Sequence, residues 1–172
     1  GSRSGKSLLA ERRAAESGLR VVYVATAQAL DDEMASRIAH HQARRRSDWV
    51  LVEEALDLAG VLRRNAAADA CVLVDCLTLW LSNLLLAAAD ERPELPAAAS
   101  PRFEDAVRAL VEVLPQLPGQ IVLVSNEVGS GIVPVAALAR RFADEQGRLN
   151  QRVAALCERV TLVVAGLPLA LK

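Results

Sequence analysis

The segment 71–75, which reads CVLVD, most narrows the folds that this chain can adopt. Its four apolar residues run without the polar alternation of a half-exposed strand. Such a run is typical of a parallel strand covered by helices on both faces. A second candidate strand, RVVYVA, spans 20–25, and helical patterns lie between the two. The sequence therefore predicts right-handed β-α-β units around a mostly parallel sheet flanked by helices, an α/β fold.

We expect strands and helices to alternate along the whole chain, which at 172 residues fits a single domain over 1–172. Strands are predicted at 20–25, 50–53, 71–75, 120–125 and 159–165. Helices are predicted at 7–17, 31–46, 56–67, 77–88, 102–114 and 135–157, with a surface loop at 90–101. Aromatic residues make up only 3% of the chain, which favours helices packed on a sheet over an aromatic-rich β-sandwich.

Charge and hydropathy argue against several classes of partner. The 20 Lys and Arg residues nearly balance the 21 Asp and Glu residues, so no net field attracts nucleic acid or an anionic membrane. The longest apolar stretch, 77–89, is too short to span a bilayer. We expect a cytoplasmic protein with no nucleic-acid partner and no stable membrane insertion. Three cysteines lack metal-ligand spacing and are expected to be buried thiols of a reducing compartment: Cys71, Cys76 and Cys157.

The first residues, GSRSGKS, match most of a phosphate-binding loop. The first glycine of that motif and the strand that feeds it would precede Gly1, and we expect both in the complete polypeptide. Small residues let backbone N–H groups converge on phosphate oxygens at a helix N-terminus. Lys6 is expected on the β- and γ-phosphates and the Ser7 hydroxyl on Mg²⁺. The expected nucleotide contacts are Gly1, Ser2, Arg3, Ser4, Gly5, Lys6 and Ser7; a Gly/Ser-rich tail is the alternative.

Asp75 follows directly on a buried strand. In open α/β sheets, ligands bind at the carboxyl ends of the strands, where Asp75 could hold Mg²⁺ directly or through water. An acid at this position is often only a helix N-cap, so the prediction depends on its pairing with the phosphate loop. The loop 125–134 also follows a predicted strand and belongs on this ligand side. The helix after it carries Arg140, Arg141, Asp144, Glu145, Arg148 and Asn150, and much of this polar set is expected to be solvated surface.

Both histidines of the chain are adjacent, at His40 and His41, inside the predicted helix 31–46. Helical spacing places His40 between Arg37 and Arg44 on one polar stripe. Flanking guanidinium groups favour the neutral imidazole, which is the nucleophilic form, and they could also neutralise a triphosphate. His41 lies on the more apolar side and is expected to pack. A solvated charged face remains the alternative for the stripe.

Several motifs, in order along essentially the whole chain, resemble one enzyme family. That family is the bifunctional adenosylcobinamide kinase/adenosylcobinamide-phosphate guanylyltransferases of cobalamin biosynthesis. The motifs are RSGKS (3–7), YVATA (23–27), DDEM (31–34), RI (37–38), HH (40–41), VDCLT (74–78), NLL (83–85), SNEVG (125–129), GIVP (131–134) and GRLNQR (147–152).

The resemblance implies a three-layer, RecA-like P-loop NTPase fold, a homotrimer and two reactions. The first phosphorylates the corrinoid adenosylcobinamide with ATP or GTP. The second transfers GMP from GTP to that phosphate through a guanylyl-histidine, which the resemblance places on His40. Guanine-nucleotide contacts are implied at Ala25, Thr26, Ala27, His41, Gln42, Ala43, Arg44, Glu53 and Asp75.

Two other readings remain open from the residues alone. A small-molecule P-loop kinase would use the phosphate loop but not the histidines, and would form no covalent GMP adduct. A GTP-regulated binding module would switch loops on nucleotide state. The sequence lacks the Asn-Lys-x-Asp signature of such switches, which argues against the second reading.

Overall fold

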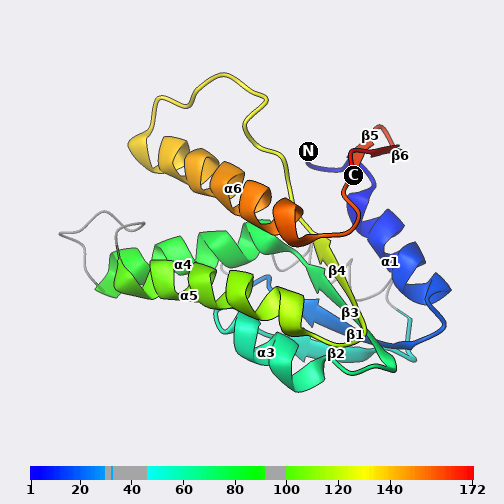
Figure 1. The fold of residues 1–172 in the computed structure, drawn as a ribbon. Helices are drawn as coiled ribbons and strands as arrows, with labels where there is room; N and C mark the ends of the chain where they lie inside the picture. The colour runs from blue at the N-terminus through cyan, green and yellow to red at the C-terminus, as the bar shows by residue number, and fades with distance from the viewer. Residues whose placement is uncertain (30–31, 33–45, 92–99) are drawn as a thin grey trace.

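The fold is seen in a computed structural model that describes residues 1–29, 32, 46–91 and 100–172 (Figure 1). Its elements, in chain order, are α1 (Lys6–Glu16), β1 (Arg20–Ala25), β2 (Val50–Glu53), α3 (Leu58–Asn65), β3 (Ala70–Asp75), α4 (Leu77–Glu91), α5 (Pro101–Val113), the short 3₁₀ helix η2 (Leu114–Gln116), β4 (Gln120–Val124), α6 (Ala137–Leu156), β5 (Thr161–Val164) and β6 (Leu167–Ala170).

The main sheet has four strands in the order β2-β1-β3-β4, and every neighbouring pair is parallel. In β3 every residue except the last is buried, as the unbroken apolar run predicts. The mostly parallel sheet flanked by helices confirms the predicted α/β class. All four strands start within one residue of the predicted positions.

Helices cover the sheet on both faces, because successive side chains of β1 and β3 point to opposite sides. Val22, Val24, Val72 and Val74 pack with the helices α3, α4, α5 and α6. The alternate side chains pack with α1, which lies on the opposite face of the sheet (Figure 1); they are Val21, Tyr23, Cys71 and Leu73. The result is a three-layer arrangement in which, among the described helices, α1 is the one that packs against this second face.

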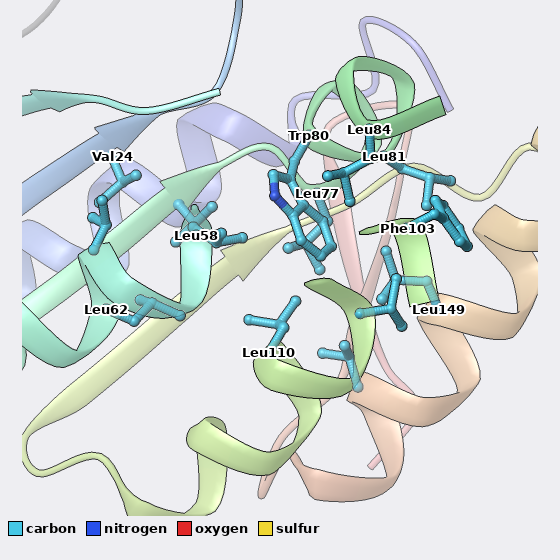
Figure 2. Close-up of a cluster of buried hydrophobic side chains, with 14 of the residues drawn as sticks. Val24, Leu58, Leu62, Leu77, Trp80, Leu81, Leu84, Phe103, Leu110 and Leu149 are labelled. Carbon is cyan, nitrogen blue, oxygen red and sulfur yellow. The ribbon is translucent and has the colours of Figure 1, made fainter. Parts of the chain in front are cut away.

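Trp80 lies at the centre of the larger core, among leucines of α3, α4 and α5 (Figure 2). It is fully buried, and its indole Nε1 donates a hydrogen bond to the carbonyl of Leu56 at 2.9 Å. A buried indole N–H requires such a partner, since leaving it unpaired costs about 1–3 kcal/mol. Core packing therefore accounts for Trp80, as the sequence indicates.

Helix boundaries follow local capping signals. Asp57 caps α3 by accepting a hydrogen bond from Gly60 N at 2.9 Å, so the helix begins at Leu58 rather than at 56. Pro101 occupies the first turn of α5, where its missing N–H costs nothing. The predicted loop 90–101 is therefore too long at both ends, since α4 extends to Glu91 and α5 starts at Pro101. The predicted helix 31–46 lies outside the described residues, apart from 32 and 46.

The predicted last strand, 159–165, is partly wrong. Only Thr161–Val164 form β5, and within the described chain β5 pairs with β6 in a separate antiparallel sheet rather than with the main sheet. The two-residue turn Ala165-Gly166 has φ values of 51° and 81°. Two successive positive φ values make the primed turn that joins tight hairpins.

Among the described residues, no helix combines the length and the apolar character that are needed to cross a bilayer.

Candidate nucleotide site

The strand register brings three of the predicted site residues into one row. Ala25 at the end of β1 is opposite Glu53 on one side and Asp75 on the other. Asp75 is in turn opposite Val124 of β4. Glu53, Ala25 and Asp75 therefore lie side by side at the carboxyl edge of the parallel sheet, the edge where α/β folds bind ligands.

The phosphate loop enters α1 through a left-handed glycine. Gly5 has φ 92° and ψ 4°, a conformation that residues with a Cβ rarely adopt, and α1 starts at Lys6. The first intrahelical bond runs from Leu9 N to Gly5 O at 3.0 Å. Gly1, Ser2 and Arg3 are exposed, whereas Ser4, Lys6 and Ser7 are half-buried. The loop thus presents the free N–H groups of a helix N-terminus, which suits anionic phosphate.

The helix that begins at Lys6 packs against the end of β3: Ala10 of α1 lies in the same buried cluster as Cys76, the residue after Asp75. Burial raises the pKa of the Cys76 thiol, the Asp75 carboxylate raises it further, and the Lys6 ammonium acts in the opposite direction. The helix that carries Lys6 and the strand that carries Asp75 therefore pack together, an arrangement that suits phosphate and metal binding.

The Asp75 carboxylate is half-buried and oriented by β1. Tyr23 donates a hydrogen bond from its hydroxyl to Asp75 Oδ2 at 3.0 Å. The Tyr23 ring also stacks on Trp49, with ring centroids 6.3 Å apart. Carboxylate and hydroxyl oxygens are the donors that Mg²⁺ prefers, so Asp75 and Ser7 fit this ion in their chemistry.

Thr26 is held inside the protein rather than presented to solvent. Its hydroxyl donates to the Cys76 carbonyl at 2.7 Å and accepts from Cys76 N at 2.9 Å. These two bonds join the chain just beyond the ends of β1 and β3. The side chain is fully buried, so its observed contacts are structural.

Two polar residues of α4 organise the sheet edge, and the sequence reasoning missed them. The Asn83 side chain donates to the carbonyls of Thr26, at 2.7 Å, and Ala55, at 3.2 Å, and so ties together the segments that follow β1 and β2. Thr78 Oγ1 accepts from Asn126 N at 2.9 Å, just after β4. One feature of the sequence could have identified them: both are polar residues within an otherwise apolar helix, and buried polar residues of this kind usually form hydrogen bonds.

The C-terminal hairpin contacts the phosphate loop, which the sequence did not predict. Gly166 N donates to the Ser4 carbonyl at 2.9 Å. A Cβ on Gly5 would lie 3.3 Å from Gly166 Cα. Figure 1 shows β5 and β6 beside the start of the chain and the N-terminal end of α1. The turn of the hairpin thus packs on the phosphate loop and restricts the backbone conformations that this loop can adopt.

Gly5→Ala is expected to destabilise the protein by about 1–2 kcal/mol, because alanine is strained at this positive φ. The close contact with Gly166 adds to the cost. Gly147→Ala is the matched control: it lies in α6 with nothing within 4 Å of an added Cβ, and it should stabilise by up to about 1 kcal/mol. Urea unfolding of both variants measures the difference. Equal effects would contradict the strained conformation.

The structure thus places Ala25, Glu53 and Asp75 in one row, and α1, which begins within the 1–7 loop, packs beside the residue that follows Asp75. His40, His41, Gln42, Ala43 and Arg44 lie outside the described residues. Cys71 and Cys76 are buried as expected, and Cys157 is half-buried; burial raises the pKa of all three thiols.

Comparison with known proteins assigns the chain to a family over essentially its whole length. A family model described as "Cobinamide kinase / cobinamide phosphate guanyltransferase" (CobU) matches residues 1–171. The bifunctional adenosylcobalamin biosynthesis protein CobP of Pseudomonas aeruginosa is 56% identical over 172 residues, which cover 100% of this chain and 94% of the relative. The bifunctional adenosylcobalamin biosynthesis proteins CobU of Salmonella typhimurium and Escherichia coli are 42% and 39% identical, over 100% of this chain and 96% of each relative. The chain therefore belongs to the cobinamide kinase/cobinamide phosphate guanyltransferase family, which confirms the resemblance and the two activities expected from the sequence.

Proposed function

We propose that one site in this protein carries out both reactions, with His40 as the covalent nucleophile. The chain phosphorylates the hydroxyl of adenosylcobinamide with ATP or GTP, and then transfers GMP from GTP to that phosphate to give adenosylcobinamide-GDP. The single observation that supports a shared site is that α1, which begins at Lys6, packs through Ala10 in one buried cluster with Cys76, the residue after Asp75. The phosphate loop and the sheet edge thereby form one phosphate-binding place, which both reactions need.

In the kinase step, the corrinoid hydroxyl oxygen attacks the γ-phosphorus, the bond from the γ-phosphorus to the bridging oxygen breaks, the nucleoside diphosphate leaves with that oxygen, and the hydroxyl proton passes to water. Lys6 and the N–H groups of the loop stabilise the negative charge that gathers on the phosphate oxygens. The phosphate loop and the first turn of α1 hold the triphosphate in line with the acceptor. Such positioning supplies most of the catalysis in phosphoryl transfer.

In the guanylyl-transfer step, an imidazole nitrogen of His40 attacks the α-phosphorus of GTP and pyrophosphate leaves. A P–N bond now holds GMP on the protein. A phosphate oxygen of adenosylcobinamide phosphate then attacks the same phosphorus, the P–N bond breaks and the histidine is restored. Covalent catalysis splits one difficult transfer into two easier ones.

Ser7 and Asp75 are the residues that would hold Mg²⁺, which would neutralise charge on the triphosphate. Asp75→Asn is expected to raise the Mg²⁺ concentration for half-maximal activity about 10- to 100-fold, since a charged ligand contributes roughly 1.5–3 kcal/mol. Asp69→Asn is the matched control, because Asp69 is exposed at the opposite end of β3. Titration of kinase activity with Mg²⁺ after EDTA treatment measures the shift. An unchanged Mg²⁺ requirement would remove Asp75 from the metal site.

Covalent labelling tests the proposal as a whole. The protein is incubated with Mg²⁺ and GTP labelled on the α-phosphate, then denatured and separated. We expect a labelled chain that loses its label in acid and keeps it in base, as a phosphoramidate does. Adding adenosylcobinamide phosphate before denaturation should move the label to the corrinoid. Active γ-phosphate transfer with no covalent label under any condition would leave a plain P-loop kinase, the alternative function.

We further propose that the protein works in the cytoplasm as a homotrimer that takes a corrinoid substrate and no nucleic acid. The family resemblance supports the trimer, and the balanced charge of the chain supports the lack of a nucleic-acid partner. Native mass spectrometry measures the assembly, and a monomer at working concentrations would contradict it.

A further inference from the structure

A network of partly buried side-chain amides joins α6 to the carboxyl end of β4. Gln146 Nε2 donates to Ser125 Oγ at 3.0 Å and to Asn150 Oδ1 at 2.9 Å. Ser125 Oγ donates to Asn150 Oδ1 at 2.6 Å. Asn150 Nδ2 donates to the Asn126 carbonyl at 2.9 Å. Much of the polar surface of this helix was expected to be solvated; Asn150 is an exception, because both ends of its half-buried amide are hydrogen-bonded within the protein.

The network fixes the backbone at the point where the chain leaves the sheet. The Asn126 peptide is held on both sides, because its N–H donates to Thr78 of α4 and its carbonyl accepts from Asn150 of α6. Val124, two residues earlier, is the strand partner of Asp75. The 125–134 loop therefore starts beside Asp75 in a direction that two helices determine.

Stability alone does not account for these residues. Gln146 is fully buried, and its helix neighbours on the same face, Leu149 and Val153, are apolar core residues. A leucine at 146 would bury no polar atoms, whereas the amide must be desolvated and then paired. Gln146 Oε1 and Asn126 Oδ1 are buried without a partner among the described residues. Buried polar groups of this kind specify one geometry more than they add stability.

We propose that Gln146 and Asn150 are positioning residues that act through the Ser125–Asn126 backbone on the nucleotide site. They do not touch the reacting atoms. They hold the start of the 125–134 loop against Asp75, so that the acceptor meets the bound nucleotide in line. The inference rests on the proposed function, since it concerns the same sheet edge.

The phosphate loop lies on a different element, α1, and takes no part in the network. Loss of the network should therefore lower kcat and leave nucleotide affinity nearly unchanged. Misplacement of about 1 Å can cost roughly 100-fold in rate. We expect a fall of about 10- to 100-fold in kcat for guanylyl transfer, with the Kd for a fluorescent GTP analogue changed less than about threefold.

The test compares Gln146→Leu with Gln151→Leu, which makes the same change on an exposed position of α6. Gln146→Leu should show the loss in kcat, an unchanged or higher urea midpoint and normal GTP-analogue binding. Gln151→Leu should match the wild type. A kcat within twofold of wild type in folded Gln146→Leu would overturn the proposal, as would a loss in proportion to unfolding.

A second pair of variants, at Ser125, tests the network without changing the sequence of α6. Ser125→Ala removes the hydroxyl at the centre of the network and should lower kcat, whereas Ser125→Thr keeps a hydroxyl and should restore most of the rate. If Gln146→Leu does not fold, the two Ser125 variants test the positioning role on their own. Equal rates for Ser125→Ala and Ser125→Thr would overturn the proposal. Wild-type protein is assayed in parallel: failure of guanylyl transfer there would refute the proposed function rather than the positioning role.

Discussion

Replacing Lys6 with methionine is expected to lower kcat/KM about 10²- to 10³-fold in both the kinase and the guanylyl-transfer reactions. Methionine keeps most of the side-chain length but removes the ammonium group that meets the phosphate oxygens. Both reactions develop negative charge on a triphosphate, so the loss should appear in both. Steady-state kinetics with ATP and with GTP, each with its own corrinoid acceptor, measure it.

Arg12→Met is the matched control for Lys6. It removes one positive charge from the same helix, but Arg12 is exposed on the side of α1 away from the buried residues Ala10 and Ala14. We expect less than a twofold change, since solvent screens an exposed charge. An equal loss in both variants would mean that the overall charge of α1, rather than Lys6, attracts the nucleotide. A normal rate in Lys6→Met would remove the phosphate loop from the site.

Replacing His40 with alanine is expected to abolish the covalent GMP adduct and to reduce guanylyl transfer by about 10⁴-fold or more, because the nucleophile is lost. The kinase reaction should continue at a rate within a few-fold of wild type, since its nucleophile is the corrinoid hydroxyl. Labelling with α-phosphate-labelled GTP and a separate γ-phosphate transfer assay measure the two activities on the same preparation.

His41→Ala is the matched control for His40 and should keep the adduct. Loss of the adduct only in His41→Ala would mean that the second ring is the nucleophile and that the helical-stripe argument selected the wrong histidine. Loss of both activities in His40→Ala would place His40 in nucleotide binding as well. Together, the Lys6 and His40 variants separate the residue shared by both reactions from the residue used by one.

Much of the fold could be predicted because burial leaves a periodic record in the sequence. The unbroken apolar run of β3 predicts a strand covered on both faces, and in the structure it lies between β1 and β4 with helices on each side. Phe103, Val107 and Leu110 recur at helical spacing in α5 and are all buried. Ends of helices were less predictable, because one capping side chain, such as Asp57, decides where a helix begins.

The position of Asp75 in the candidate site could also be predicted, since the carboxyl ends of parallel strands meet at the same edge of the sheet. Asp75 was placed there by its position after a strand, and the register with Ala25 bears this out. The C-terminal hairpin was not predicted, since a positive φ at Ala165 is not expected of alanine. The hairpin contacts Ser4, near the other end of the chain, and local sequence patterns cannot predict a contact between segments so far apart in sequence.

By itself, the sequence determined the class of sheet and the family that its motifs identify, and it predicted a phosphate loop with Lys6. These depend on residue type and on spacing within single segments, where steric and burial preferences act locally. Only the tertiary structure decided that Asn150 and Gln146 are internal, that Thr26 is buried, and that Gly166 supports the phosphate loop. A polar side chain suits either water or a buried partner, and the choice depends on which distant segment folding brings within hydrogen-bond distance.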